Sequence, residues 1–235
     1  MLRALLLDFN GVLLDDEPLH LELLQRVLAE EGVELAAAEV RRRFLGRDDR
    51  ASFEGALTTA GQEAPAHRVE RLVARKARYY RDAVHQRGHT FFPGALELVR
   101  SAADAGLMLG IVSGALADEI DAALRSAAAR ELFKAVVSGD DVTAGKPSPE
   151  GYRMGMQLLN ATPPLPERLV HPHETLAIED APPGLAAARD AGLVTLAVAH
   201  SWPVAELALA DVVVPSLEGL TLPALQALYA EASRA

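Results

Sequence analysis

Short apolar runs that alternate with longer helical stretches constrain the fold of this chain more than any other feature. Six such runs are predicted to be strands: Ala4–Leu7, Leu107–Ser113, Ala135–Ser138, Thr175–Ile178, Thr195–Val198 and Asp211–Val214. The intervening stretches rich in alanine, leucine and arginine are predicted to be helices, as in Ala95–Ala105, Ala117–Ala128 and Pro183–Ala191. Strands that alternate with helices of this length form βαβ units around a mostly parallel sheet. Several runs are continuously apolar, as expected when helices cover both sheet faces. The predicted fold class is therefore α/β, with a Rossmann-like parallel sheet.

One interval departs from this alternation. Between about Asp16 and Phe92 the pattern is amphipathic and helical, with predicted helices at Leu19–Glu30, Ala36–Phe44, Ala51–Ala60 and Ala66–Ala83. We therefore expect a core domain of residues 1–15 and 93–235 and an inserted helical cap domain of residues 16–92. The last residues, 217–235, are expected to form a docked terminal helix with a frayed tail.

The composition excludes several classes of function. The chain has 235 residues, a formal net charge of −10 and no cysteine. Its charge opposes binding to nucleic acid or to anionic membranes, and the absence of cysteine excludes disulfides, thiolate catalysis and zinc–thiolate sites. No apolar run reaches the roughly 18 residues that a membrane span requires, and Asp8 interrupts the first apolar stretch before a signal peptide could be completed. We expect a cytoplasmic protein, either a monomer or a weak homodimer.

Asp8 is the first candidate for chemistry. It follows the predicted strand Ala4–Leu7 and precedes a turn at Gly11. Open α/β sheets place their reacting groups at the carboxyl ends of the strands. A carboxylate there can attack phosphorus and form an aspartyl-phosphate, although a lone aspartate at a strand end more often caps a turn.

Three further short motifs follow predicted strands or open predicted helices. Ser113 and Gly114 could hold a phosphate through a hydroxyl and backbone N–H groups, or could simply begin a helix. Lys146 is one of three lysines in the chain and stands beside a proline, where it could offset the charge of a phosphoryl group. Glu179 and Asp180 end another strand, and paired carboxylates are costly to place together without a cation. Oxygen ligands of this kind suit Mg²⁺.

Taken in this order, the motifs resemble those of the haloacid dehalogenase superfamily over nearly the whole chain. The resemblance is closest to the branch that contains β-phosphoglucomutase and phosphoglycolate-type phosphatases. It implies that Asp8 is the nucleophile, that Asp180 and the main-chain carbonyl of Asn10 bind magnesium, and that Ser113 and Lys146 hold phosphate. With Glu179 included, the predicted metal site comprises Asp8, Asn10, Glu179 and Asp180. Members of this branch also carry a small helical cap at the position of the insertion.

The cap domain contributes weaker candidates for substrate binding. His20 lies where this branch often has a histidine, and the segment containing Gly46, Arg47 and Arg50 resembles the loop of the cap that faces the substrate. Either arginine could bind an anionic group in a bidentate manner, and Lys76 is a further candidate. For each of these residues a structural or solvated role is equally compatible with the sequence.

Asn10 departs from the pattern of the resembled phosphatases, which have an aspartate there as general acid and base. An amide cannot exchange a proton at neutral pH, so turnover should be slowed by roughly 10²–10⁴-fold unless another group compensates. Asp16, or its neighbour Glu17, could supply the acid. Alternatively, the substrate could have a good leaving group, or the protein could bind a phosphorylated ligand with little catalysis.

A metal-independent dehalogenase is a further alternative, since such relatives lack the second aspartate, but Glu179 and Asp180 favour phosphate chemistry. The predicted function is thus magnesium-dependent transfer of a phosphoryl group from a small phosphorylated metabolite to Asp8 and then to water.

Overall fold

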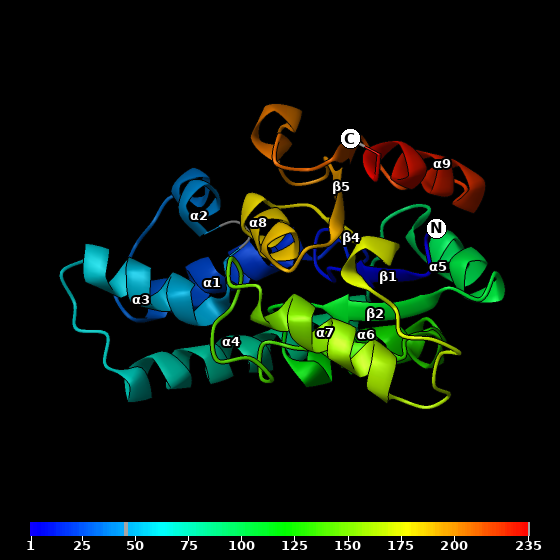
Figure 1. The fold of residues 1–235 in the computed structure, drawn as a ribbon. Helices are drawn as coiled ribbons and strands as arrows, with labels where there is room; N and C mark the ends of the chain where they lie inside the picture. Colours follow the sequence, from blue (N-terminus) through cyan, green and yellow to red (C-terminus); the bar gives the residue numbers. More distant parts are fainter. Residues whose placement is uncertain (45–46, 235) are drawn as a thin grey trace. The chain divides into compact units, whose positions relative to one another are not determined.

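The computed structural model describes residues 1–44 and 47–234. Within them, six parallel strands form one sheet in the order β3-β2-β1-β4-β5-β6 (Figure 1). The strands are β1 (Ala4–Leu7), β2 (Met108–Val112), β3 (Ala135–Val137), β4 (Thr175–Glu179), β5 (Val194–Val198) and β6 (Val212–Val214). All six strands coincide with predicted ones to within one residue at each end, and the predicted parallel α/β fold is confirmed.

Both faces of the sheet carry buried residues, and successive residues of β1 alternate between two hydrophobic clusters. Leu5 and Leu7 of β1 point into one cluster, and Ala4 and Leu6 of the same strand point into another. This division follows from the two-residue period of a strand. It explains why β1 is apolar at every position and has no polar face for solvent.

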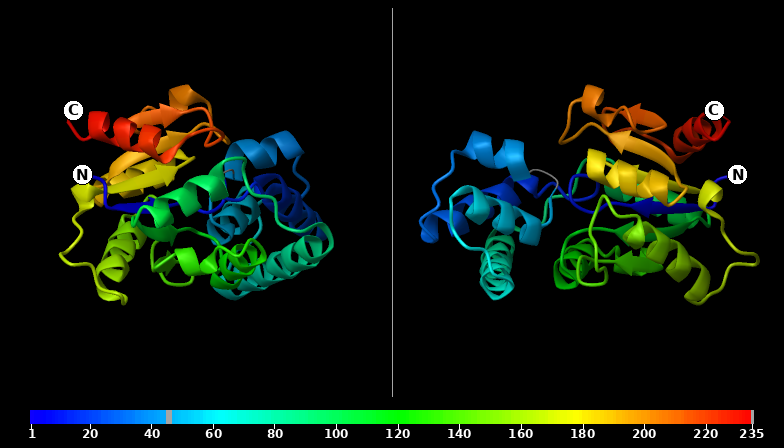
Figure 2. Two further views of the ribbon diagram at one scale, coloured as in Figure 1. Left: turned by 90° about the vertical axis from the view of Figure 1, so that its right-hand side faces the viewer. Right: turned by 60° about the vertical axis from the view of Figure 1, so that its left-hand side comes forward.

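Helices supply the other half of each core, on opposite faces of the sheet (Figure 2). The first cluster includes residues of α5 (Ala95–Asp104), α6 (Ala117–Ser126) and α9 (Leu222–Ala232). The second includes residues of α7 (Glu150–Ala161) and α8 (Pro182–Asp190). Three short 3₁₀ helices among the described residues were not predicted: η1 (Arg130–Leu132), η2 (Pro172–Glu174) and η3 (Val204–Leu207). The terminal helix α9 is shorter than the predicted segment, and it is anchored through buried Leu225 and Tyr229.

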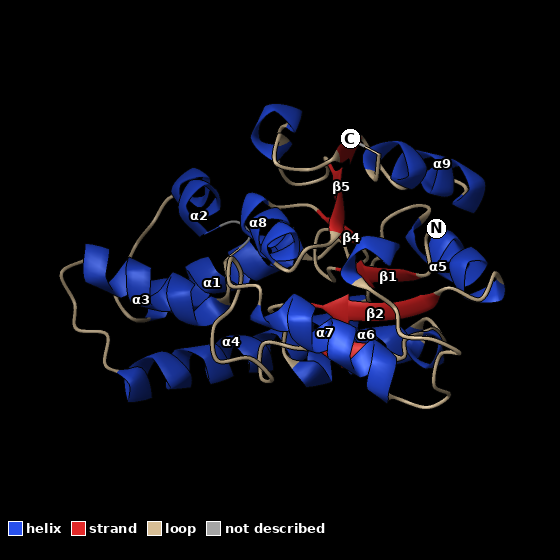
Figure 3. Cartoon of the chain, in the orientation of Figure 1, coloured by secondary structure: helices blue, strands red, loops and turns tan. Residues whose placement is uncertain are grey.

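The stretch between β1 and α5 is helical in its described residues (Figure 3). It contains α1 (Glu17–Glu30), α2 (Ala37–Phe44), α3 (Asp49–Thr59) and α4 (Ala66–Arg87). These helices enclose a hydrophobic core of their own, which includes Val27, Phe53 and Leu72. A separate core is what allows a segment of this size to fold as a distinct unit.

The chain accordingly divides into two compact units. Residues Met1–Asp15 and Phe91–Ala235 form the core unit, and Asp16–Thr90 form the helical unit. The chain returns to the core unit at Phe91, two residues before the predicted boundary, because Phe91 bridges to Leu14 and the Phe92 N–H donates to the Leu13 carbonyl. Among the described helices, none is both long and apolar enough to cross a bilayer.

Candidate functional site

The register of the three central strands brings the predicted motifs to one edge of the sheet. Leu7 pairs with Ile111 of β2 and with Ile178 of β4. Asp8, Ser113 and the Glu179–Asp180 pair therefore all stand at the carboxyl ends of neighbouring parallel strands. The Asp8 N–H also donates to the Ile178 carbonyl at 2.9 Å, which continues the ladder between β1 and β4 past the end of β1.

Three carboxylates meet at this edge. Asp8, Glu179 and Asp180 can each place one oxygen within 4.8 Å of the other two. Asp8 retains some exposure, whereas Glu179 is fully buried and Asp180 nearly so. Three buried or half-buried carboxylates repel one another strongly, so the cluster requires positive charge to be stable.

Lys146 provides part of that charge. Its Nζ lies 2.9 Å from Asp8 Oδ1 and 2.6 Å from Glu179 Oε1. Burial alone would lower the pKa of Lys146, but the Asp8 and Glu179 carboxylates raise it above its usual value. The ammonium group therefore stays charged at neutral pH and bridges two of the three carboxylates.

The pKa of Glu179 is raised by its surroundings. Burial raises its pKa above the ordinary range, and Asp8 adds to the effect, although Lys146 and the Tyr152 hydroxyl act in the opposite direction. Tyr152 is fully buried and donates its hydroxyl hydrogen to Glu179 Oε1. Within the described residues, Glu179 Oε2 is buried and has no hydrogen-bond partner. A buried, underpaired carboxylate of this kind is a common feature of functional sites.

Two glycines leave the space that the carboxylates occupy. Gly11 has a φ of +80°, and a Cβ at this position would lie 2.1 Å from Asp180 Oδ2. A Cβ on Gly184, in α8, would lie equally close to the Glu179 carboxylate. Every residue other than glycine would therefore displace a carboxylate of the cluster at these two positions.

The remaining predicted core residues also lie at this edge. Ser113 is nearly buried, and its Oγ accepts a hydrogen bond from the Ala115 N–H at 3.2 Å, so the Ser113–Gly114 turn begins the segment that leads into α6. Asn10 lies in the turn after β1 and forms an isolated bridge with Leu14. The sheet thus brings together the predicted motifs Asp8, Asn10, Ser113 and Glu179–Asp180, and the ion pairs add Lys146.

A second polar cluster lies within the helical unit. Asp16 is buried, and its Oδ2 accepts hydrogen bonds from the Tyr80 hydroxyl at 2.6 Å and from His20 Nε2 at 3.0 Å. Lys76 Nζ contacts the other ring nitrogen of His20 at 2.6 Å and Asp49 Oδ1 at 2.5 Å. Since a lysine ammonium can only donate, His20 Nδ1 accepts and its Nε2–H donates to Asp16.

These hydrogen bonds reach only one of the two carboxylate oxygens of Asp16. Its Oδ1 is buried and has no hydrogen-bond partner among the residues that the structure describes. Burial and Lys76 lower the pKa of His20, but the Asp16 and Asp49 carboxylates raise it by more, so the pKa lies above its ordinary value. Lys76 is itself almost completely buried, and its ammonium contacts Asp49 and His20.

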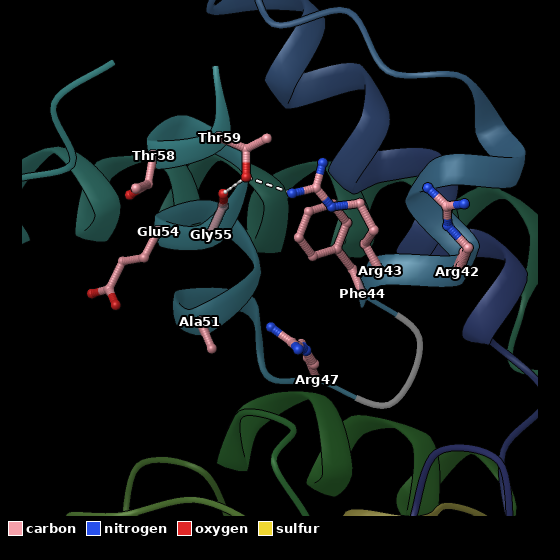
Figure 4. A pocket seen from close by; sticks show the side chains of 9 residues that line it. All are labelled: Arg42, Arg43, Phe44, Arg47, Ala51, Glu54, Gly55, Thr58 and Thr59. Carbon is pink, nitrogen blue, oxygen red and sulfur yellow. Dashed lines mark hydrogen bonds between the residues drawn. The ribbon is translucent and has the colours of Figure 1, made fainter. Parts of the chain in front are cut away.

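The predicted arginines of the helical unit lie elsewhere on its surface. Arg50 is exposed and lies 3.7 Å from Glu70, a weak surface ion pair. Arg47 is exposed and lines a pocket of about 700 Å³ together with Arg42, Arg43 and Thr59 (Figure 4). In that pocket Arg43 is already engaged by Glu39 and by the Thr59 hydroxyl. Gly46, the other predicted residue of this segment, lies outside the described residues.

The prediction from sequence did not include Tyr152, Tyr80 or His200. Tyr152 and Tyr80 lie at apolar helical positions and would be assigned to the core, so only their hydroxyl partners reveal a polar role. His200 follows β5, and its Nδ1 lies 2.9 Å from the Gly11 carbonyl oxygen. Its position shortly after the end of a predicted strand was the signal that the sequence offered.

Both the sequence and the fold of this chain match known proteins. A family model described as haloacid dehalogenase-like hydrolase matches residues 5–198. The chain is 30% identical over 230 residues to a validoxylamine A 7'-phosphate phosphatase of Streptomyces hygroscopicus subsp. limoneus, covering 95% of this chain and 98% of that protein.

Two solved structures are also similar. One is an aspartate-to-asparagine mutant of CbbY from Rhodobacter sphaeroides, solved in complex with xylulose-(1,5)bisphosphate. It has a TM-score of 0.82 and 26% sequence identity to this chain, and the match covers 96% of this chain and 99% of that one. The other is a β-phosphoglucomutase from Clostridium difficile, with a TM-score of 0.84, 20% identity and 98% coverage of both chains, which supports the fold alone.

Proposed function

The chain belongs to the haloacid dehalogenase-like hydrolases and is a hydrolase of the phosphatase type, and from this premise we propose that it removes a phosphoryl group from a small phosphorylated metabolite through an aspartyl-phosphate on Asp8. The observation that carries the proposal is the cluster of Asp8, Glu179 and Asp180 around the Lys146 ammonium. Relatives of this chain are phosphatases that act on phosphorylated metabolites.

Mg²⁺ fits this cluster. The cluster offers only oxygen ligands, which Mg²⁺ prefers, and the single Lys146 ammonium cannot balance three carboxylates. Asp8, Asp180 and the main-chain carbonyl of Asn10 would hold the ion, with Glu179 supplying the third carboxylate of the site and anchoring Lys146. When bound, the ion would neutralise charge on the phosphoryl oxygens and so allow an anionic nucleophile to approach.

Each of these residues of the core unit would have a separate role in phosphoryl transfer. The Asp8 carboxylate attacks phosphorus, the bond from phosphorus to the leaving oxygen breaks, and water then attacks the phosphorus of the aspartyl-phosphate to release inorganic phosphate and restore Asp8. Lys146 offsets the charge of Asp8 and of the transferring group. The Ser113 hydroxyl and the backbone N–H groups beside Gly114 hold the non-reacting phosphoryl oxygens.

Asn10 cannot carry the proton that the leaving oxygen requires, and we propose that Asp16 does so. Support comes from the geometry of Asp16 within the helical unit, where Tyr80 and His20 hold one oxygen and the other is left without a partner. A carboxyl group held at one oxygen is restricted in orientation and has the other available for proton transfer. Asp16 also follows Asn10 by only six positions in the chain.

The proposed substrate is a phosphate monoester of a sugar or a sugar-like polyol. Support comes from the relatives, because one dephosphorylates validoxylamine A 7'-phosphate and the solved CbbY mutant holds a sugar bisphosphate. Within the helical unit, His20, Lys76, Arg47 and Arg50 remain proposed contributors to substrate binding.

A panel of phosphorylated metabolites, with and without magnesium, tests the proposal. We expect release of phosphate from at least one sugar phosphate, loss of release when EDTA removes magnesium, and loss in Asp8→Asn. Binding of the same substrates without release of phosphate would instead assign the protein a ligand-binding role. Release of halide from haloacids without metal would assign it to the dehalogenases.

Three variants test whether Asp16 supplies the proton to the leaving oxygen. Asp16→Asn should lower turnover by about 10²-fold or more, and Asp15→Asn is the matched control because Asp15 is its exposed neighbour. Asn10→Asp in the Asp16→Asn background should restore turnover. If Asp16→Asn and Asp15→Asn are equally active, Asp16 is not the acid.

A further inference from the structure

We propose that His200 is a positioning residue that holds the turn after the nucleophile, and with it the main-chain carbonyl of Asn10, in the geometry required by the divalent ion. The proposal rests on the function proposed above, because the ion is part of that function. His200 lies 189 residues from the turn in sequence, directly after the loop residue that follows β5.

The first contact is a hydrogen bond to the turn itself. His200 Nδ1 lies 2.9 Å from the carbonyl oxygen of Gly11. Because a carbonyl oxygen can only accept, the proton must reside on Nδ1. In the neutral ring, Nε2 is then an acceptor, and it lies 3.5 Å from the Ser216 hydroxyl. These contacts assign one tautomer to His200 and give its ring a fixed direction.

The second contact fixes the plane of the ring. His200 stacks on Phe92 with ring centroids 3.9 Å apart and an angle of 16° between the rings. The Phe92 N–H in turn donates to the Leu13 carbonyl at 2.9 Å. His200, which follows β5, and Phe92, which precedes α5, therefore both contact the turn after β1. The stacked rings join these two contacts.

The turn needs an external restraint because its central residue is glycine. Gly11 has a φ of +80° and lacks a side chain that could restrict rotation of the peptide groups beside it. A larger residue cannot supply the restraint, since a Cβ would collide with Asp180. The Gly11 N–H is held by the Leu14 carbonyl, and His200 holds the Gly11 carbonyl on the other side of the same residue.

Both peptide groups of Gly11 are thus anchored, and the Asn10 carbonyl belongs to the first of them. Loss of the anchor at the second would let the Gly11–Val12 peptide rotate, and the position of the Asn10 carbonyl would become less defined. Groups that orient metal ligands without touching the metal commonly change metal affinity by about 10- to 100-fold when removed. His200 contacts the turn through a single hydrogen bond, so we expect the lower part of this range.

Two substitutions separate the hydrogen bond from the stack. His200→Phe retains an aromatic ring against Phe92 and removes the donor, whereas His200→Asn removes the ring and retains an N–H donor close to the position of Nδ1. His173→Phe is the matched control, because His173 is an exposed histidine of the same unit. The readout is the Mg²⁺ dissociation constant of the metal-free protein, measured by titration calorimetry without substrate, together with the urea midpoint without metal.

We expect His200→Phe to weaken Mg²⁺ binding about five- to tenfold, His200→Asn to regain most of that loss, and His173→Phe to match the native protein. At saturating Mg²⁺ the kcat of His200→Phe should return close to the native value, because His200 touches no reacting atom. A native-like Mg²⁺ affinity in His200→Phe, or equal losses in His200→Phe and His200→Asn, would overturn the proposal. Absence of Mg²⁺ binding in the native protein would overturn the metal site of the proposed function and this inference with it.

Discussion

Gly11 offers the sharpest test of how tightly the proposed metal site is built. A Cβ in Gly11→Ala would lie 2.1 Å from Asp180 Oδ2 and 2.4 Å from its Cγ, whereas ordinary contacts begin at 3.4 Å. Either the Asp180 carboxylate or the turn must therefore move by more than 1 Å. A displacement of about 1 Å in a reacting group can reduce turnover by roughly 10²-fold.

The backbone strain of the same substitution can be measured separately. Gly11 and Gly106 both have a φ of +80° and both lie in the core unit, but a Cβ on Gly106 would meet nothing within 4 Å. Each alanine should cost about 1–2 kcal/mol of stability for the left-handed backbone. Only Gly11→Ala should also displace Asp180, so the difference between the two variants isolates that displacement.

The assay compares phosphate release and Mg²⁺ affinity in the two variants, with urea unfolding as the measure of stability. We expect turnover to fall at least about 10²-fold in Gly11→Ala and to stay within about twofold of native in Gly106→Ala. Equal activity in both variants would refute the claim that Asp180 must occupy the space beside Gly11.

Three further predictions concern charges and hydroxyls near the site and at the far end of β4. Lys146→Met should reduce phosphate release by about 10²-fold or more because it removes the cation between Asp8 and Glu179, whereas Lys134→Met, measured in the same assay, should have little effect. Tyr152→Phe should lower the free energy of unfolding by about 1–3 kcal/mol, measured in urea, because the buried Glu179 carboxylate loses a donor. Arg168 lowers the pKa of Glu174 from 4.5 to about 2, so stability that is present above pH 4.5 should be lost as the pH falls toward 2. Glu174→Gln should abolish this part of the acid dependence, and an unchanged acid unfolding profile would contradict the assignment.

The sequence alone was sufficient to predict the strands of the sheet and the motifs at their carboxyl ends. Each strand is a short and mainly apolar run, so its position could be predicted to within a residue, and parallel strands place their carboxyl ends together. The resemblance to the haloacid dehalogenases, which rested on Asp8, Ser113, Lys146 and the Glu179–Asp180 pair, is confirmed by the family match.

Contacts between residues distant in the chain could not be predicted in this way. His200 reaches the Gly11 carbonyl across 189 positions, and no periodicity or motif links the two residues. Tyr152 and Tyr80 follow helical apolar patterns, which report burial and give no information on the partner of a hydroxyl group. The environment of Lys76 was equally hidden, because a lysine at that position is expected at the surface and instead lies buried between Asp49 and His20.

The central claim is that the Asp8 side chain becomes covalently phosphorylated, and chemical trapping tests it most directly. Borohydride added during turnover reduces an aspartyl-phosphate to homoserine, which mass spectrometry can locate in a peptide. We predict homoserine at position 8 in the presence of substrate and Mg²⁺, and none when either is omitted. Sustained release of phosphate with position 8 unmodified, or with the modification at another carboxylate, would contradict the account.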